Sequence, residues 1–197
     1  MQSPPLSRAA FLLAGGKSSR MGENKAFIDF RGQTLLEHAL AALSETARNV
    51  TIVGDPEIFA RHGRVISDIF PGCGPLAGIH AALTHSSAEL NLMLAVDMPF
   101  VSSGLVSFLI EAATERTATV VVPRTQRGLQ PLCAVYRRDF ASVAEQAIRT
   151  GIFKIDAAFA GVSVEVIEET ELAAAGFLER AFFNVNTPDD RRTAGEV

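Results

Sequence analysis

The amino-acid sequence predicts a single-domain α/β fold with a mostly parallel sheet. Three observations support this prediction. Short runs rich in Val, Ile, Leu and Phe recur along the chain, segments with helical spacing of apolar residues separate them, and a length of 197 residues fits one domain. Strands that alternate with helices need crossover connections, and such connections place neighbouring strands parallel to one another.

Seven apolar runs are expected to be strands because β-branched and aromatic residues favour extended backbone. They are Ala9–Leu13, Val50–Val53, Arg64–Ile66, Leu92–Val96, Thr119–Val122, Leu132–Tyr136 and Val162–Ile167. Between them, apolar residues repeat at helical spacing in four segments. These expected helices are Thr34–Ser44, Leu76–Thr84, Ser102–Ala113 and Asp139–Arg149.

Residues that favour the first position of a helix mark several helix starts. Ser102 and Asp139 are each expected to cap the helix that they begin, and Thr187-Pro188 is expected to open a last helix. Residues 1–7 contain two prolines and are expected to form a flexible N-terminus. The domain is therefore expected to span residues 8–197.

Charge and hydropathy narrow the class of function. The chain carries 18 Lys and Arg against 22 Asp and Glu, and its net charge of −4 is opposite to the basic surface of a nucleic-acid binder. No apolar run approaches the ~18–20 residues of a membrane helix, and no signal peptide is recognisable. We therefore expect a cytoplasmic protein that binds neither nucleic acid nor membranes.

A glycine-rich loop with clustered cations follows the first expected strand. It reads Leu13-Ala14-Gly15-Gly16-Lys17-Ser18-Ser19-Arg20-Met21-Gly22-Glu23-Asn24-Lys25. Glycines let backbone N–H groups approach a ligand closely, and successive N–H groups form a concavity that holds anions. Two of the chain's three lysines lie here beside Arg20, which argues for an anionic ligand such as a polyphosphate; the alternative is a solvent-exposed glycine turn with incidental charges. The loop is not the phosphate loop of NTPases, because Phe11 stands where that motif has its first glycine.

A carboxylate ends the most apolar of the expected strands. Leu92–Val96 is continuously apolar, as in a strand buried on both faces, and Asp97 follows it directly. Mg²⁺ accepts one or two protein carboxylates and takes its other ligands from water and substrate phosphates. Asp97 is thus expected either to bind Mg²⁺ opposite the glycine-rich loop or to cap the helix that begins near Ser102.

A second carboxylate, Asp68, ends the short strand Arg64–Ile66 and precedes a turn rich in glycine and proline. Its side chain could accept hydrogen bonds from a base or a ribose, or it could serve only to solvate the turn. The helix that begins after Gly74 would present free backbone N–H groups to an anion or a polar base edge.

The glycine-rich loop resembles the signature of the molybdenum cofactor guanylyltransferases, within the wider family of nucleotide-sugar-type nucleotidyltransferases. The matching positions are Leu13-Ala14-Gly15-Gly16, Ser18, Arg20-Met21-Gly22 and Lys25. The resemblance extends from Arg8 to Arg192 and includes Asp97, the turn Gly74–Gly78 and the segment Asn184-Val185-Asn186-Thr187-Pro188. It implies a Rossmann-like, three-layer nucleotidyltransferase fold. It also implies transfer of GMP from Mg-GTP to molybdopterin, giving molybdopterin guanine dinucleotide and pyrophosphate.

The resemblance implies a role for each matching residue. Arg20, Lys25 and Asp97 are expected to be catalytic, with Asp97 as the Mg²⁺ ligand. Asn184 and Asn186, on one face of an expected strand, would bind the acceptor, with a second contact in the loop Thr125–Gly128. Transient contact with other cofactor-pathway proteins or apo-molybdoenzymes is also implied. The expected nucleotide-binding residues are Leu13, Ala14, Gly15, Gly16, Lys25, Asp68, Gly78 and Asp97.

The sequence leaves alternatives for the nucleotide that is used and for the reaction. Gly15-Gly16 resembles the GTP users, whereas relatives that use CTP tend to read Leu-Ala-Ala-Gly. Many relatives offer an asparagine to the guanine after the second strand, but this chain has Val53-Gly54-Asp55. A cytidylyltransferase or a sugar-phosphate nucleotidyltransferase is the alternative within the enzymes. A non-catalytic nucleotide-binding module is the alternative outside them, and it would bind GTP without releasing pyrophosphate.

Overall fold

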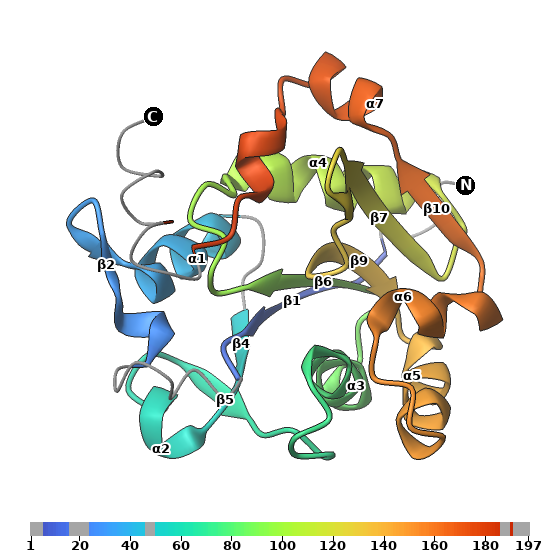
Figure 1. The fold of residues 1–197 in the computed structure, drawn as a ribbon, viewed down its shortest axis with the longest axis horizontal. Helices are drawn as coiled ribbons and strands as arrows, with labels where there is room; N and C mark the ends of the chain where they lie inside the picture. Colours follow the sequence, from blue (N-terminus) through green and yellow to red (C-terminus); the bar gives the residue numbers. More distant parts are fainter. Residues whose placement is uncertain (1–5, 16–23, 46–49, 186–189, 191–197) are drawn as a thin grey trace.

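A twisted central sheet runs through the computed structural model, which describes residues 6–15, 24–45, 50–185 and 190 (Figure 1). The strand order is β10-β7-β9-β6-β1-β4-β5, and β8 pairs with β7 outside this path. The strands are β1 (Arg8–Leu13), β4 (Val50–Val53), β5 (Arg64–Ile66), β6 (Leu90–Ala95), β7 (Val120–Thr125), β8 (Gly128–Leu129), β9 (Cys133–Arg137) and β10 (Val164–Ile167).

The sheet is mostly parallel, as the alternation of apolar runs predicts. Strand β1 pairs in parallel with β4 and β6, β4 with β5, and β7 with β10. The exceptions are β8, which runs antiparallel to β7, and β9, which runs antiparallel to both β6 and β7. The chain between β7 and β9 is too short for a parallel crossover, which needs a dozen residues or more, so β9 returns in the opposite direction.

Helices cover both faces of the sheet and make three layers. Figure 1 shows α1 and α4 on one face and α3 and α5 on the other. Two clusters of buried apolar side chains match these layers, one containing residues of α1 and α4 and the other residues of α3 and α5. The helices are α1 (Leu35–Ser44), α2 (Pro56–Phe59), α3 (Pro75–His85), α4 (Ser103–Glu115), α5 (Phe140–Arg149), α6 (Ile155–Ala158) and α7 (Glu169–Ala174).

The helix starts agree in part with the capping signals. Ser102 accepts a hydrogen bond from the Leu105 backbone N–H, which confirms it as the cap of α4. Asp139 precedes α5, but the prediction that its side chain caps the helix is wrong. Its carboxylate instead accepts a hydrogen bond from the Thr119 hydroxyl, at 3.4 Å. The helix expected at Thr187-Pro188 lies outside the described residues.

A small hairpin and several short helices were not predicted. Strands β2 (Asp29–Phe30) and β3 (Gln33–Thr34) are joined by Arg31 and Gly32, which both have positive φ, at 55° and 83°. Such a two-residue turn matches the twist of a hairpin, but the usual Asn-Gly or Asp-Gly signal is absent. The short 3-10 helices are η2 (Lys25–Phe27), η3 (Phe159–Gly161) and η4 (Glu179–Phe182).

Part of the N-terminal segment is tied to the sheet, although we expected residues 1–7 to be flexible. Of the expected flexible segment, residues 1–5 lie outside the described part, whereas Ser7 donates its N–H to the Glu89 carboxylate at 3.2 Å. The Ser7 carbonyl accepts from Leu90 at the start of β6. Among the residues that the structure describes, no helix has the length and apolar character needed to cross a membrane.

Gly54, directly after β4, allows a close contact that shapes the edge of the sheet. A Cβ atom at this position would lie 2.9 Å from Cδ2 of Phe59, which is 1% exposed and cannot move away easily. Phe59 stacks on Phe27 with ring centroids 5.7 Å apart, so α2 packs against η2. Any side chain at position 54 would disturb this packing.

We therefore expect Gly54→Ala to destabilise the protein by about 1–3 kcal/mol, the usual cost of overpacking a buried site. Urea unfolding measures this difference. The control is Gly161→Ala, where the added Cβ would meet Val143 at an ordinary 3.7 Å, so no destabilisation is expected. Wild-type stability in Gly54→Ala would contradict the packing argument.

Candidate functional site

The carboxyl ends of β4, β1 and β6 lie side by side, and the loops that follow them meet there. Leu13 at the end of β1 is in register with Val53 of β4 and with Ala95 of β6. The Ala14 N–H donates to the Val53 carbonyl at 3.0 Å, and the Val96 N–H donates to the Leu13 carbonyl at 3.1 Å. The start of the glycine-rich loop is thereby held between the two neighbouring strand ends.

Lys25 and Asp97 form an ion pair at this edge of the sheet. The Lys25 Nζ lies 2.5 Å from Asp97 Oδ2, and the two side chains are 18% and 20% exposed. The second oxygen, Asp97 Oδ1, is buried and has no hydrogen-bond partner among the described residues. Leaving a buried carboxylate oxygen unpaired is costly, so this atom has the character of a ligand position.

Local structure places Lys25 opposite Asp97. Lys25 begins η2, whose start is capped by Asn24 through a 3.0 Å hydrogen bond from the Ala26 N–H. Ala26 is fully buried and anchors this turn in the core. Asp97 follows β6, and its carbonyl accepts a 2.8 Å hydrogen bond from the Val185 N–H. Both ends of the ion pair are therefore held by backbone contacts.

The donor set at Asp97 fits a hard divalent cation. Mg²⁺ prefers carboxylate oxygens and commonly takes only one or two from the protein, with water and phosphate oxygens completing the shell. Within the described ranges, no group of three or more His, Cys, Asp and Glu side chains could hold a metal by itself. Asp97 Oδ1 is thus suited to a cation that arrives with a phosphate-bearing ligand, while Oδ2 faces Lys25. The prediction that Asp97 caps α4 is excluded, because Ser102 does so.

Asp68 lies between the glycine-rich loop and α3. A Cβ built on Gly15 would be 3.9 Å from Asp68 Oδ2, and one built on Gly78 would be 3.6 Å from Asp68 Oδ1. The same Cβ on Gly78 would lie 3.4 Å from the Leu13 side chain. The Asp68 carboxylate therefore lies close to both glycine positions at the carboxyl end of the sheet. Burial raises the pKa of Asp68 above its usual value.

The start of α3 faces this part of the site with exposed backbone. Its N-terminal residue, Gly74, has φ 74°, and no side chain caps the helix. Pro75 occupies the first turn, where a missing N–H costs nothing. The uncapped start agrees with the expectation that backbone N–H groups are presented there.

The loop after β4 has Gly54 and Asp55 where the sequence resemblance leads one to expect an asparagine. The Gly54 N–H is already used, donating to the Ile66 carbonyl at 2.9 Å. The Asp55 side chain is also engaged, because it accepts from the Glu57 N–H at the start of α2. Base recognition by the Gly54 N–H would therefore require breaking an existing hydrogen bond, whereas the exposed Asp55 carboxylate keeps its second oxygen available to another donor.

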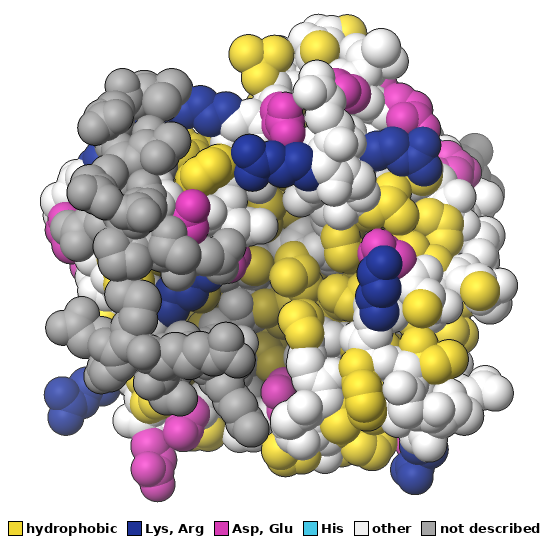
Figure 2. Space-filling model, viewed as in Figure 1, with side chains coloured by type: hydrophobic (Ala, Val, Ile, Leu, Met, Phe, Trp, Pro, Cys, Tyr) yellow, Lys and Arg dark blue, Asp and Glu magenta, His cyan; other side chains and the backbone are white. Residues whose placement is uncertain are grey.

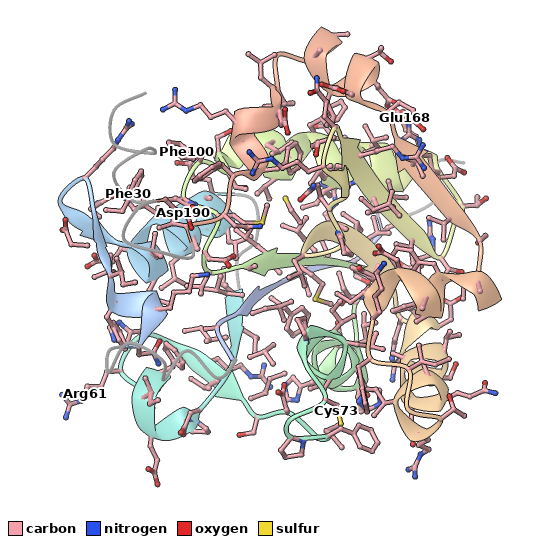
Figure 3. All side chains as sticks on the ribbon, viewed as in Figure 1. Phe30, Arg61, Cys73, Phe100, Glu168 and Asp190 are labelled. Atoms are coloured by element: carbon pink, nitrogen blue, oxygen red, sulfur yellow. The ribbon has the colours of Figure 1, made fainter. Side chains whose placement is uncertain are left out.

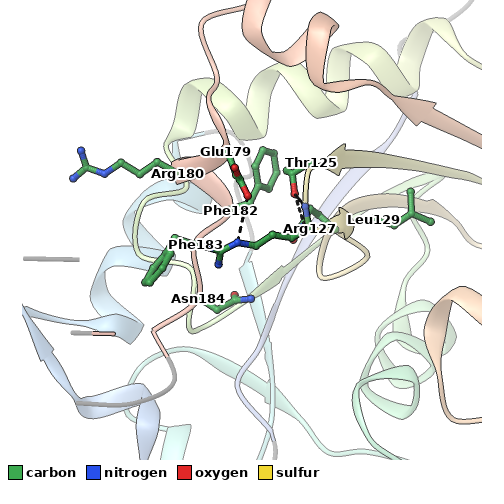
Figure 4. Close-up of a pocket in the computed structure, with 9 residues that line it drawn as sticks. Thr125, Arg127, Leu129, Glu179, Arg180, Phe182, Phe183 and Asn184 are labelled. Atoms are coloured by element: carbon green, nitrogen blue, oxygen red, sulfur yellow. Dashed lines mark hydrogen bonds and ion pairs between the residues drawn. The ribbon is translucent and has the colours of Figure 1, made fainter. Parts of the chain in front are cut away.

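A cavity of about 460 Å³ lies next to the segment that carries Asn184 (Figure 4). Asn184, Thr125 and Gln130 line it, so the C-terminal segment and the loop Thr125–Gly128 face the same space, as expected. The prediction of a strand through Asn184 and Asn186 is wrong for the described part, because η4 ends at Phe182 and residues 183–185 are irregular. Asn186 lies outside the described residues, as do Gly16 and Arg20.

Phe100 connects the segments that carry the candidate residues, and the sequence analysis missed it. Its ring makes edge contacts with Phe30, at 5.4 Å between centroids, and with Phe183, at 6.4 Å. Phe30 follows η2, and Phe183 precedes Asn184. Figure 3 shows Phe30 and Phe100 near one another beside α1. The guanidinium of Arg180 also lies over the Phe100 ring at 4.6 Å. In the sequence, the only indication of this role was an aromatic residue three positions after Asp97.

The face that contains these loops is hollowed. Figure 2 shows hydrophobic side chains near the centre of the hollow and cationic and acidic side chains around it. A concave apolar floor with a few polar groups at its border is the usual form of a small-molecule site.

The raised pKa of Asp68 gives a prediction for the ligand-free protein. A carboxyl whose folded pKa is raised favours the folded state only below its unfolded pKa, near 3.9, and this contribution is lost as pH rises through the folded pKa. Asp68→Asn should therefore raise stability at pH 7, by less than about 1 kcal/mol because the carboxyl is only partly buried and is screened by water. Urea unfolding at pH 7 and pH 3.5 tests this. A variant less stable than wild type at pH 7 would contradict the sign.

Comparison with known proteins adds an independent finding. Residues 10–162 match the family model described as a MobA-like NTP transferase domain. A probable molybdenum cofactor guanylyltransferase of Clostridium perfringens is 33% identical over 194 residues, covering 94% of both chains. One of Pelotomaculum thermopropionicum is 37% identical, covering 94% of this chain and 90% of its own.

A solved structure agrees with these relatives. The molybdopterin-guanine dinucleotide biosynthesis protein A from Archaeoglobus fulgidus superposes with a TM-score of 0.84 at 30% identity, covering 96% of this chain and 97% of its own. A 2-C-methyl-D-erythritol 4-phosphate cytidylyltransferase from Thermus thermophilus superposes with a TM-score of 0.68 at 23% identity, which shows a shared fold.

Proposed function

The chain belongs to the family of MobA-like NTP transferase domains, and on this premise we propose that it transfers GMP from GTP to molybdopterin. The products are molybdopterin guanine dinucleotide and pyrophosphate. The observation that supports the proposal most strongly is the Lys25–Asp97 ion pair, whose buried Asp97 Oδ1 has no hydrogen-bond partner among the residues that the structure describes, beside the start of the glycine-rich loop. This arrangement places the ammonium group of Lys25 and a carboxylate oxygen that can bind a metal ion where a triphosphate would lie.

The nucleotide would lie across the strand ends. Leu13, Ala14 and Gly15 bring backbone groups to the phosphates, and Gly16 and Arg20 continue the same loop. Asp68 lies close to Gly15 and Gly78, where its carboxylate can accept hydrogen bonds from the ribose or the base. Its raised pKa shows that burial leaves the charged carboxylate poorly solvated. A hydrogen-bond donor on the nucleotide would stabilise that charge.

The reaction needs alignment and charge neutralisation more than proton transfer. The acceptor's phosphate is already an anionic nucleophile, so no strong general base is required. Catalysis then depends on holding this phosphate opposite the leaving pyrophosphate while charge at the α-phosphorus is stabilised. Lys25 supplies a fixed ammonium group for that purpose, held in place by η2.

Mg²⁺ is part of this proposal, with Asp97 Oδ1 as its ligand from the protein. When bound, Mg²⁺ would neutralise phosphate charge and act as a Lewis acid. Asp97 holds Lys25 through Oδ2, and its buried Oδ1 accepts no hydrogen bond from the described residues. Asn184, whose neighbour Val185 is bonded to the Asp97 carbonyl, would orient the acceptor.

The product of the proposed reaction indicates which proteins this chain would contact and where it would act. A dinucleotide cofactor has to reach the enzymes that use it, so transient contact with cofactor-pathway proteins or apo-molybdoenzymes belongs to the proposal. A cytoplasmic location belongs to it as well.

Asp97→Ala should reduce pyrophosphate release by at least about 100-fold, because it removes charge stabilisation at the reacting phosphates. GTP should remain bound, since the loop backbone and Asp68 are intact. Pyrophosphate release and GTP titration measure the two effects. Asp97→Asn, which keeps the shape, should lose activity similarly, and Asp156→Ala on α6 is the control with wild-type turnover. Equal activity in Asp97→Ala would contradict the assignment.

Nucleotide choice is tested by pyrophosphate release from GTP, CTP and UTP with molybdopterin present. We expect release from GTP to exceed release from the other two nucleotides by at least tenfold. Preference for CTP would establish the cytidylyltransferase alternative. Binding of GTP without release of pyrophosphate would establish a nucleotide-binding module.

A further inference from the structure

The cavity beside Asn184 contains an arginine whose hydrogen-bonding capacity is mostly unused. Arg127 projects from the turn between β7 and β8, and its own N–H donates to the Thr125 hydroxyl at 3.2 Å. Its side-chain Nε lies 3.3 Å from Glu179 Oε1 on η4. Within the described part of the chain, no further hydrogen bond or ion pair of this guanidinium is found, so both terminal amino groups are available.

Two neighbours hold this guanidinium in one orientation. Glu179 binds the Nε side, and the guanidinium carbon lies 5.4 Å from the centre of the Phe183 ring. Figure 4 shows the guanidinium between Phe183 and Asn184, with the ion pair to Glu179 on its other side. An arginine that is stacked and paired in this way loses little side-chain entropy when it binds a ligand.

A purely structural role explains these contacts poorly. The Arg127 side chain is 66% exposed, and an exposed ion pair contributes about 0–1 kcal/mol to stability. The cavity lining includes two arginines and one glutamate, which leaves an excess of positive charge in an otherwise acidic protein. Fork-shaped donors of this kind bind phosphate in a bidentate manner.

We propose that Arg127 binds the phosphate of the acceptor and selects a phosphorylated pterin over its dephosphorylated form. The inference rests on the proposed function and assigns a binding residue within it. Arg127 presents two donors to the phosphate, Asn184 lies beside it, and the Val185–Asp97 hydrogen bond connects this segment to the Lys25–Asp97 pair. The acceptor phosphate is thereby brought toward the nucleotide.

The test measures binding of molybdopterin and of dephosphorylated molybdopterin, by ligand fluorescence, to the wild type and to Arg127→Ala. The wild type should bind the phosphorylated form about 10–100-fold more tightly, as expected for a charge-assisted bidentate contact. Arg127→Ala should bind the two forms equally, with its affinity for the dephosphorylated form unchanged. Its affinity for GTP should also stay within twofold of wild type.

The matched control is Arg124→Ala. Arg124 lies on β7, just before the turn that carries Arg127, and pairs with Glu168 at 3.0 Å, so the variant removes the same charge and a similar ion pair outside the cavity lining. It should keep wild-type discrimination. The inference would be overturned if Arg127→Ala still preferred the phosphorylated form, or if it lost affinity for both forms alike.

Failure of the proposed function would look different. A wild-type protein that binds molybdopterin but transfers no GMP to it would contradict the proposed function, while the discrimination between the two pterins would still decide the role of Arg127. A wild type that binds neither pterin would overturn both proposals together.

Discussion

The ion pair between Lys25 and Asp97 is the interaction on which the rest of the site depends. It joins residues 72 positions apart at the carboxyl end of the sheet, and it engages one carboxylate oxygen, while the other is buried and finds no hydrogen-bond partner within the part of the chain that the structure describes. A buried carboxylate without a full set of partners is costly to keep in a stable fold. The parallel pairing of β1 with β6 makes the arrangement possible, because it places the glycine-rich loop and the Asp97 loop at the same edge.

The surrounding structure holds three segments in one place. Phe100 packs against Phe30, next to the segment of Lys25, and against Phe183, next to Asn184. The Val185–Asp97 hydrogen bond adds a backbone link between the same parts. The nucleotide side, the candidate metal ligand and the acceptor cavity are therefore parts of one packed unit. Sites held on such packed elements keep reacting groups within the small tolerances that phosphoryl transfer needs.

The sequence predicted the parts of this molecule that depend on local patterns. Continuous apolar runs predicted β1, β4 and β6, and the carboxyl ends of these strands, at Leu13, Val53 and Ala95, lie side by side as a parallel sheet requires. It could not predict the reversal of β9 or the contacts of Phe100, because both follow from tertiary packing. The sequence led us to expect an acceptor contact in the loop Thr125–Gly128 but did not single out Arg127, because the orientation of its guanidinium depends on Glu179, 52 positions further along the chain. The sequence did not show whether the Gly54 backbone could contact a base. The hydrogen bond from its N–H to the Ile66 carbonyl shows that this N–H is already used.

The central claim is that a triphosphate and a divalent cation meet at the Lys25–Asp97 pair. A crystal structure with GTP and Mn²⁺ in place of Mg²⁺ tests it most directly, because Mn²⁺ gives an anomalous signal that marks its position. The account predicts an anomalous peak in contact with Asp97 Oδ1, with the phosphates between the glycine-rich loop and Lys25. A cation bound away from Asp97, or phosphates that leave this edge of the sheet empty, would contradict it.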